Sequence, residues 1–388
     1  MKKVISTEKI PIKLWLDKIE DGALNQAKNL ANLPFAFKHI ALMPDAHEGF
    51  GMPIGGILAT EKVVVPNAVG VDIGCGMCAV KTNLTEIESK KLKQILTGIR
   101  KRIPVGFNHH KEKQDISLMP SIENIPEKGI VLREFESALK QIGTLGGGNH
   151  FIEIQKSKDG FIWIMIHSGS RNIGFKVAEY YNKTAKKLNE RWFSEVPQKA
   201  DLAFLPIETE EANNYISEMR YCVDFALANR KLMIKNIQET MLEVLNKISF
   251  GEMTNIAHNY ACWENHFGKN VIVHRKGATS AKSGETGIIP GSQGTNSYIV
   301  KGLGNPESFM SCSHGAGRIM GGNQAKRELN LKEQIELLDK KGIIHAIRHK
   351  KDLDEAPAAY KNIEEVIENQ NDLVEIIVEL SPLAVIKG

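Results

Sequence analysis

The stretch from Asn67 to Val80, NAVGVDIGCGMCAV, constrains this chain more than any other segment. A short apolar run bounded by glycines is typical of a buried strand that ends in a tight turn. We therefore expect a strand that ends at Asp72, with Cys75 in the turn that follows. A carboxylate and a thiolate placed in this way can reach one cation. Together with histidines they are ligands that suit zinc, manganese or iron.

The same stretch has a second interpretation, in which Cys75 and Cys78 are small buried hydrophobic residues and Asp72 caps a turn. Taken in isolation, the stretch favours this interpretation over a metal site. Cys75 and Cys78 also form a Cys-x-x-Cys pair, which occurs in redox and zinc sites. The chain contains no second pair of this kind, so the sequence excludes a zinc site built from two such pairs.

The composition predicts a folded protein of a reducing compartment. The chain has 388 residues, 42% of them hydrophobic, which is enough for one large domain or two of ordinary size. Its net charge of +4 is too small to predict a polyanionic partner. Five cysteines fit reduced thiols. Because we find neither a signal peptide nor an apolar run of membrane-spanning length, we expect a cytoplasmic protein without a membrane partner.

Apolar periodicity predicts the main helices and strands. We expect helices over residues 21–33, 92–103, 208–247 and 364–379, and strands over residues 39–43, 54–60, 77–83, 161–166 and 271–274. Several of these strands run into glycine-rich segments. Ligand sites in sheet proteins concentrate at strand ends, so these segments are the places to look for chemistry.

Four histidines stand beside glycine, serine or asparagine, mostly where an apolar run ends: His150, His167, His258 and His314. Each of them alone is more often a core or turn histidine than a ligand. Together with Asp72 and Cys75, however, they would suffice for two adjacent metals with a bridging thiolate. One histidine would then remain free to attack a phosphoryl centre. Two divalent cations would neutralise triphosphate oxygens during that attack.

Two further segments suit phosphate chemistry. Residues 282–297 combine glycines with hydroxyl side chains, which favours a phosphate or a ribose, although the pattern matches neither a Walker loop nor a dinucleotide fingerprint. Arg318 follows His314 by four residues, so at the start of a helix both side chains would share one face. An imidazole beside a guanidinium is suited to phosphoryl transfer.

Several short segments occur in one order over nearly the whole chain: PDAHEG, VGVDIGCGM, GGGNHFIE, IHSGSRNIG, HNYA, RKGA, IIPGSQG, CSHGAGR, AYK and the terminal IKG. In this order they resemble the RtcB family of RNA-splicing ligases. The resemblance implies a single α/β (α+β) domain over residues 1–388, with a β-rich core surrounded by helices. It also implies an RNA ligase that uses GTP and two Mn²⁺ ions.

The resemblance assigns a role to each matching residue. Asp72 and His150 would bind one manganese ion, His167 and His258 the other, and Cys75 both. His314 would be the nucleophile that takes GMP from GTP, within a nucleotide site that includes Gly315, Ala316 and Gly317. Asn149, Arg171 and Arg318 would hold phosphates of the nucleotide or of the RNA end. Glu153, Ser292, Ser297 and Lys387 would recognise guanine, with Tyr360 packed on it. Asp45 would lie beside the metals, and Lys276 would contact a phosphate.

The implied reaction has three steps: guanylylation of His314, transfer of GMP to an RNA 3′-phosphate, and attack by a 5′-hydroxyl with loss of GMP. A 2′,3′-cyclic phosphate is opened to the 3′-phosphate first. The implied partners are therefore GTP and RNA with such ends, in RNA repair or tRNA splicing. The resemblance leaves open the physiological RNA, the need for an activating protein partner and the oligomeric state.

The chain departs from the family pattern at two positions. Gly322 stands where the family usually carries another arginine, and Gln293 stands where a methionine is common. The missing arginine removes one anion contact and keeps two alternatives open: a metal-dependent RNA-end hydrolase that opens cyclic phosphates without joining, and an RNA-end binding protein without turnover. His314 favours the ligase over the hydrolase, because hydrolysis needs no nucleophilic histidine. The complete metal set argues against the binding protein.

Overall fold

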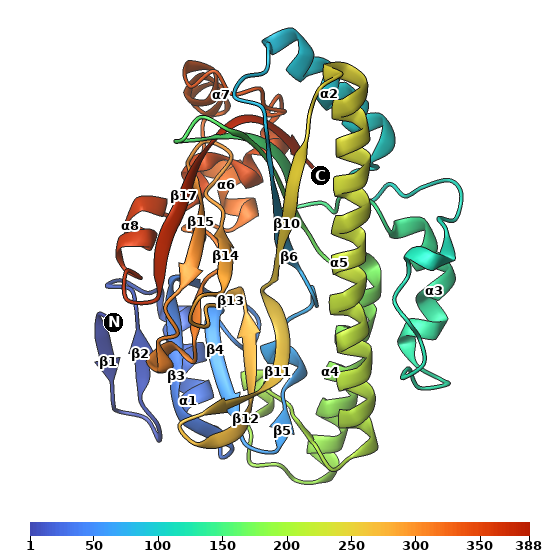
Figure 1. Ribbon diagram of the computed structural model, residues 1–388. Helices are drawn as coiled ribbons and strands as arrows, with labels where there is room; N and C mark the ends of the chain where they lie inside the picture. Colours follow the sequence, from blue (N-terminus) through green and yellow to red (C-terminus); the bar gives the residue numbers. More distant parts are fainter.

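The computed structural model describes residues 1–388 and has a β-rich centre with helices outside it (Figure 1). One sheet has six strands in the order β1 (Lys3–Ile5), β2 (Ile12–Leu14), β3 (Ala36–His47), β4 (Ile54–Thr60), β12 (Lys269–Lys276) and β11 (Asn259–His266). The other has seven, in the order β10 (Phe250–Ala257), β6 (Gly76–Thr82), β8 (Ile162–Ser168), β7 (Phe151–Ser157), β17 (Val374–Lys387), β15 (Ser297–Gly302) and β14 (Thr286–Ile289). Two small sheets pair β13 (Ala278–Ser280) with β16 (Ser311–Ser313) and β5 (Val63–Val64) with β9 (Leu205–Pro206).

The helices lie mostly on the outside of the sheets. The α-helices are α1 (Asp21–Ala31), α2 (Ser89–Arg102), α3 (Ile130–Gln141), α4 (Arg171–Arg191), α5 (Glu210–Leu245), α6 (Gly322–Glu328), α7 (Leu331–Lys340) and α8 (Ile363–Glu368). Short 3₁₀ turns are η1 (Pro66–Ala68), η2 (Ile116–Leu118), η3 (Gln198–Ala200), η4 (Pro306–Ser308), η5 (Lys350–Glu355) and η6 (Pro357–Ala359). None of the helices has both the length and the apolar character that a membrane crossing requires. The mixed α/β fold with a β-rich core is confirmed.

The long helix α5 runs along one side of the molecule (Figure 1). It contains neither glycine nor proline, and the side chain of Thr209 caps its first turn by accepting from the N–H of Ala212. Its apolar residues, such as Met233 and Ile237, pack with α2 against one face of the seven-stranded sheet. Burial of this stripe explains why the predicted helix over residues 208–247 forms.

Other apolar clusters cover the remaining faces. The second face of the seven-stranded sheet packs on α7, where Leu338 meets Met77 and Met165. Helix α1 covers the six-stranded sheet through Ala27 and Leu30. Apolar side chains therefore pack on both faces of the seven-stranded sheet. This packing fixes the strand ends that carry the predicted metal ligands.

Two of the predicted elements are wrong. No strand leads into Asp72, because Pro66 starts the turn η1 and the chain then bends through Gly70 and Gly74, whose φ angles are +91° and +75°. The strand β6 begins only after Cys75. The helix expected over residues 364–379 ends at Glu368. Residues 369–373 form a turn, and the rest of that stretch belongs to β17, which pairs with both β15 and β7.

A third expectation also fails, since His314 and Arg318 do not share a helix face. Both residues lie in an irregular segment between β16 and α6, and α6 begins at Gly322. Arg318 instead pairs through a single β-bridge with Tyr360. This bridge turns Arg318 toward the C-terminal part of the chain rather than toward His314.

Candidate active site

The register of the seven-stranded sheet places several chemically active residues at one end of it. Gly76, the first residue of β6, pairs with Ser168 of β8 and with Ala257 of β10. Cys75, directly before β6, therefore lies beside His258, which follows β10 and donates its backbone N–H to the oxygen of Cys75. His167, near the end of β8, pairs with Met77 on the other side of β6. These positions are far apart in the sequence, and only the strand pairing brings them together.

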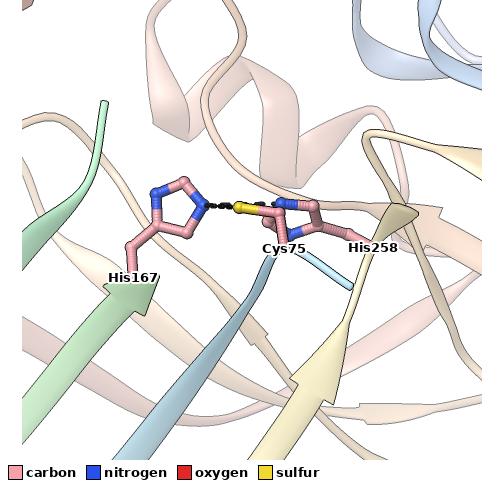
Figure 2. Close-up of side chains that lie close together, drawn as sticks. All are labelled: Cys75, His167 and His258. Carbon is pink, nitrogen blue, oxygen red and sulfur yellow. Dashed lines mark hydrogen bonds between the residues drawn. The ribbon is translucent and has the colours of Figure 1, made fainter. Parts of the chain in front are cut away.

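Three of these side chains converge on one point (Figure 2). The Nε2 atom of His167 lies 3.2 Å from Sγ of Cys75 and 3.4 Å from Nε2 of His258. All three side chains are almost completely buried. A thiol and two imidazoles at such distances are a donor set for a transition-metal ion or zinc.

A second donor group shares the same cysteine. Nε2 of His150 lies 3.2 Å from Sγ of Cys75 and 3.2 Å from Oδ2 of Asp72. Phe151 pairs with His167 across β7 and β8, so His150 stands next to the first group. Two three-membered groups with one common sulfur are the arrangement that two neighbouring cations require.

The protonation of these groups fits cation binding. Burial lowers the pKa values of His167 and His258 well below the usual value, so both rings are neutral at pH 7. Nδ1 of His167 lies 3.1 Å from the backbone oxygen of Asn149, to which it donates, and this leaves the Nε2 lone pair directed at the shared point. Burial raises the pKa of the Cys75 thiol, so a cation would have to displace its proton.

Arg230 lies beneath this group. It comes from α5, is completely buried, and donates to the backbone oxygens of Gly74 and Ser168 and to Oδ1 of Asn255. It forms no ion pair with a carboxylate, and its second amino group has no hydrogen-bond partner. Arg230 thus ties the turn that carries Asp72 and Cys75 to the end of β8, and it places a positive charge behind the sulfur.

His314 stands beside the donor groups, with its ring centroid 4.8 Å from that of His258. Its Nδ1 lies 2.6 Å from Oδ2 of Asp45, and the same oxygen accepts the backbone N–H groups of His314 and Gly315. Burial alone would raise the pKa of Asp45, but His314, Lys361 and His47 together outweigh it, and the pKa is lower than usual. The fixed Nδ1 leaves Nε2 as the nitrogen that can react.

A pocket opens in front of His314. It is lined by His47, Asn149, Glu153, His167, Ser292, Gln293, the run from His314 to Arg318, Glu355, Tyr360 and Lys387, among others. Lys387 reaches the pocket because it ends β17, which lies beside β7 in the sheet. The pocket therefore borders one of the donor groups on one side and the C-terminal strand on the other.

Glu153 is a buried carboxyl group in the wall of this pocket. Burial raises its pKa to about 8, although a hydrogen bond from Gln155 and the charge of Lys387 act in the opposite direction. Nε2 of Gln155 lies 2.6 Å from Oε2 of Glu153 and 3.1 Å from Oγ of Ser297. Without a ligand, Glu153 is thus held close to its neutral form at pH 7.

Most of the predicted site residues come together around the donor groups and the pocket, and four others have protein partners in this structure. Asp45 contacts His314, whose ring lies beside that of His258. Ser297 lies behind the pocket, where its hydroxyl accepts from the N–H of Gly291. Arg171 donates to Thr144 and to the backbone oxygen of Gly106. Lys276 donates to the backbone oxygens of Phe50 and Asn67.

Sequence reasoning missed two residues of this region. Glu355 lies in the pocket and contacts Arg318, Tyr360 and Lys387. Its position five residues before Tyr360 of the AYK segment was the only available hint. Arg230 gave no hint at all, because an arginine within a long helical pattern normally faces solvent.

Comparison with known proteins identifies the family of this chain. The family model described as "tRNA-splicing ligase RtcB" matches residues 26–388. The RNA-splicing ligase RtcB of Escherichia coli K12 is 38% identical over 413 aligned positions, which cover 100% of this chain and 99% of that protein. The tRNA-splicing ligase RtcB of Nanoarchaeum equitans is 32% identical and covers 98% of this chain and 95% of its own length. That of Thermococcus kodakarensis is 30% identical, with 95% and 92% covered. The chain therefore belongs to the RtcB family.

Proposed function

We propose that this chain is an RNA ligase that uses GTP and Mn²⁺ to join an RNA 3′-phosphate, or a 2′,3′-cyclic phosphate, to a 5′-hydroxyl. One observation carries the proposal: two donor groups that share Cys75 lie directly beside a histidine whose Nδ1 is fixed by a buried carboxylate. The names of the full-length relatives support the reaction class.

The donor set fits a pair of divalent cations. Asp72, Cys75 and His150 would hold one, and Cys75, His167 and His258 the other. The sulfur of Cys75 lies 3.2 Å from Nε2 of His150 and 3.2 Å from Nε2 of His167, and the Nε2 atoms of His167 and His258 are 3.4 Å apart. Such short distances between donor atoms are expected where the donors bind one cation. Bound Mn²⁺ would supply charge that stabilises the phosphate oxygens during transfer. The same donor set also accepts zinc, so manganese rests on the family resemblance.

The residues of this chain supply the nucleophile and its orientation. Asp45 holds the His314 ring so that Nε2 faces the pocket. Nε2 forms a bond to the α-phosphorus of GTP, and the bond from that phosphorus to the pyrophosphate oxygen breaks. Pyrophosphate leaves, and GMP stays on His314. Asp45 stabilises the positive charge that develops on the ring.

Two further transfers complete the reaction. An oxygen of the RNA 3′-phosphate attacks the GMP phosphorus and displaces Nε2 of His314. The 5′-hydroxyl of the second RNA strand then attacks the activated 3′-phosphorus, loses its proton, and releases GMP. A 2′,3′-cyclic phosphate would first be opened by water. Asn149 and Arg318 line the pocket where they would contact phosphates.

Guanine recognition would use the wall opposite His314. Glu153 would accept from the N1 and N2 donors of guanine, while Ser292 and Lys387 would donate to its acceptors. Tyr360 would pack on the base. Ser297 would act indirectly, because its hydroxyl oxygen accepts hydrogen bonds from the N–H of Gly291 and from Nε2 of Gln155.

Labelling with GTP tests the proposal. The protein is incubated with Mn²⁺ and α-labelled GTP, and label on the chain is measured after denaturation. We expect label on the wild type and on His109→Ala, an exposed histidine control, and none on His314→Ala. The wild type should then join a 3′-phosphate strand to a 5′-hydroxyl strand. Cyclic-phosphate opening without any label would instead assign the hydrolase, and RNA binding without either activity would assign a binding protein.

A further inference from the structure

One carboxylate in the pocket organises three of its polar side chains. Oε2 of Glu355 accepts from the hydroxyl of Tyr360 and lies 3.3 Å from Nζ of Lys387. Oε1 accepts from a guanidinium nitrogen of Arg318. The side chain of Glu355 is only 8% exposed, and the charges of Lys387 and Arg318 keep its pKa below the usual value although burial acts to raise it.

This geometry leaves little of Glu355 for a ligand. A carboxylate offers about four lone-pair positions, and three of them already serve protein donors. Glu355 is therefore unsuited to bind a base directly. Its effect on a bound nucleotide must pass through Tyr360, Lys387 and Arg318, which all line the pocket.

The backbone around Glu355 is also fixed. Nε2 of Gln293 lies 2.7 Å from the backbone oxygen of Glu355, and Arg318 donates to the backbone oxygen of Asp354 over 2.8 Å. Arg318 and Tyr360 are joined by a β-bridge, and the guanidinium carbon lies 4.9 Å from the centre of the Tyr360 ring. Gln293 is one of the two departures from the family pattern, and here it has a defined structural partner.

The ion pair matters because Lys387 would otherwise be loosely held. It is the last residue of β17, and its long side chain has many rotamers. The charge of Glu355 favours the rotamer in which the Lys387 amino group lies beside the carboxylate. A lysine can only donate hydrogen bonds and therefore favours the guanine oxygen over the amino group of adenine. A pocket rejects the wrong base only when its polar groups stay in place and would be left unpaired.

We propose that Glu355 determines the selectivity of the pocket for guanine over adenine, by fixing Lys387 and Tyr360 as a positioning residue. This inference rests on the proposed function, because it takes the pocket to hold a guanine nucleotide. It adds a residue that acts without touching the base, and it predicts a change in the ratio of two affinities rather than a general loss of binding.

The test measures equilibrium binding of GTP and of ATP by calorimetry with Mn²⁺ present. All variants carry His314→Ala, so that no covalent transfer disturbs the equilibrium. We expect Glu355→Gln, which keeps the shape and an acceptor for Tyr360 but removes the charge, to lower the GTP/ATP affinity ratio at least tenfold. Asp354→Asn is the matched control, because its side chain pairs with Lys326 outside the pocket, and it should leave the ratio within twofold.

A double-mutant cycle separates positioning from a merely structural role. If Glu355 acts largely through Lys387, adding Glu355→Gln to Lys387→Met should change the ratio by less than about threefold further. Tyr360→Phe, which removes the hydroxyl but keeps the ring, should lower the ratio less than Glu355→Gln does. Thermal unfolding of each variant shows that the protein is folded.

The outcomes are distinct. A GTP/ATP ratio within twofold of the parent for folded Glu355→Gln overturns the inference, and so do fully additive effects of Glu355→Gln and Lys387→Met. Equal affinity of the parent for GTP and ATP overturns it as well. If no label appears in the GTP experiment but Glu355→Gln still lowers the GTP/ATP affinity ratio at least tenfold, the ligase reaction is refuted and the role of Glu355 is retained.

Discussion

Nδ1 of His314 lies 2.6 Å from Oδ2 of Asp45, a carboxylate that is completely buried. This contact decides which ring nitrogen of His314 is available, and it connects this proposed nucleophile to β3 of the six-stranded sheet. The cation donors, in contrast, belong to the ends of the seven-stranded sheet and the turns beside them. The proposed reaction centre therefore lies where the two sheets meet.

Asp45→Asn should slow guanylylation of His314 by about 100-fold or more, because an amide neither fixes the same tautomer nor stabilises a charged ring. The rate of label transfer under single-turnover conditions measures this effect. Asp17→Asn, at an exposed site, serves as the control. Mn²⁺ binding should stay normal in both variants, and a wild-type rate in Asp45→Asn would contradict the role of this contact.

Binding of Mn²⁺ should release close to one proton at pH 7. The pKa of Cys75 is raised, so its thiol is protonated beforehand, whereas burial keeps His167 and His258 neutral. Affinity should therefore rise with pH, by up to tenfold per unit below the thiol pKa. Calorimetry in buffers of different ionisation enthalpy counts the protons. Binding that is independent of pH between 6 and 8 would speak against the thiolate ligand.

Cys75→Ala should weaken both cation sites, because the sulfur belongs to both donor groups. His258→Ala removes a donor from only one group and should leave the other site largely intact. Metal content after dialysis, measured for both variants and for Cys222→Ala as a buried control, distinguishes them. Retention of two tightly bound ions by Cys75→Ala would refute the shared ligand.

Arg230→Met should lower the free energy of unfolding by about 2–4 kcal/mol, since it leaves the buried oxygens of Gly74 and Ser168 without a donor. It should also weaken Mn²⁺ binding, because the turn that carries Asp72 loses its anchor. Denaturant unfolding measures the first effect and calorimetry the second. Arg220→Met, on the exposed side of the same helix, should change neither.

Glu153→Gln should change the pH dependence of stability in the absence of nucleotide. The pKa of Glu153 is about 8 in the folded protein, against 4.5 for an unperturbed glutamate. Since the folded pKa is raised, stability from this group is complete below pH 4.5 and is lost as pH rises toward 8. The glutamine variant should remove this loss, which is about 4 kcal/mol at pH 8. Unfolding curves at several pH values, with exposed Glu375→Gln as control, measure it.

The spacing of apolar residues correctly predicted those helices and strands that have the same pattern of burial along their whole length. The helix over residues 208–247 and the buried strand over residues 161–166 are such cases. The segment after Glu368 misled the prediction, because exposed Glu375, Ile376 and Ile377 break the alternation that identifies a strand. Its strand state comes from pairing with two neighbours that are distant in sequence.

The candidate site was only partly accessible from the sequence for a similar reason. Histidines beside glycines at strand ends marked the donor groups, and the ordered segments of the family marked the pocket. Nothing local identified Arg230, and only its nearness to the AYK segment pointed to Glu355, because each acts through partners that the fold brings from elsewhere. Their roles, like those of the other site residues, stay predictions until the variants are measured.

The place of β17 in the sheet has a consequence for biosynthesis. This strand follows both β7 and β15 in the sequence, yet it lies between them in the interior of the seven-stranded sheet. While the ribosome is still translating, β7 and β15 each expose an unpaired edge, which is a target for aggregation and for chaperones. We expect nascent chains that lack this strand to be captured by chaperones and to complete the seven-stranded sheet only after release.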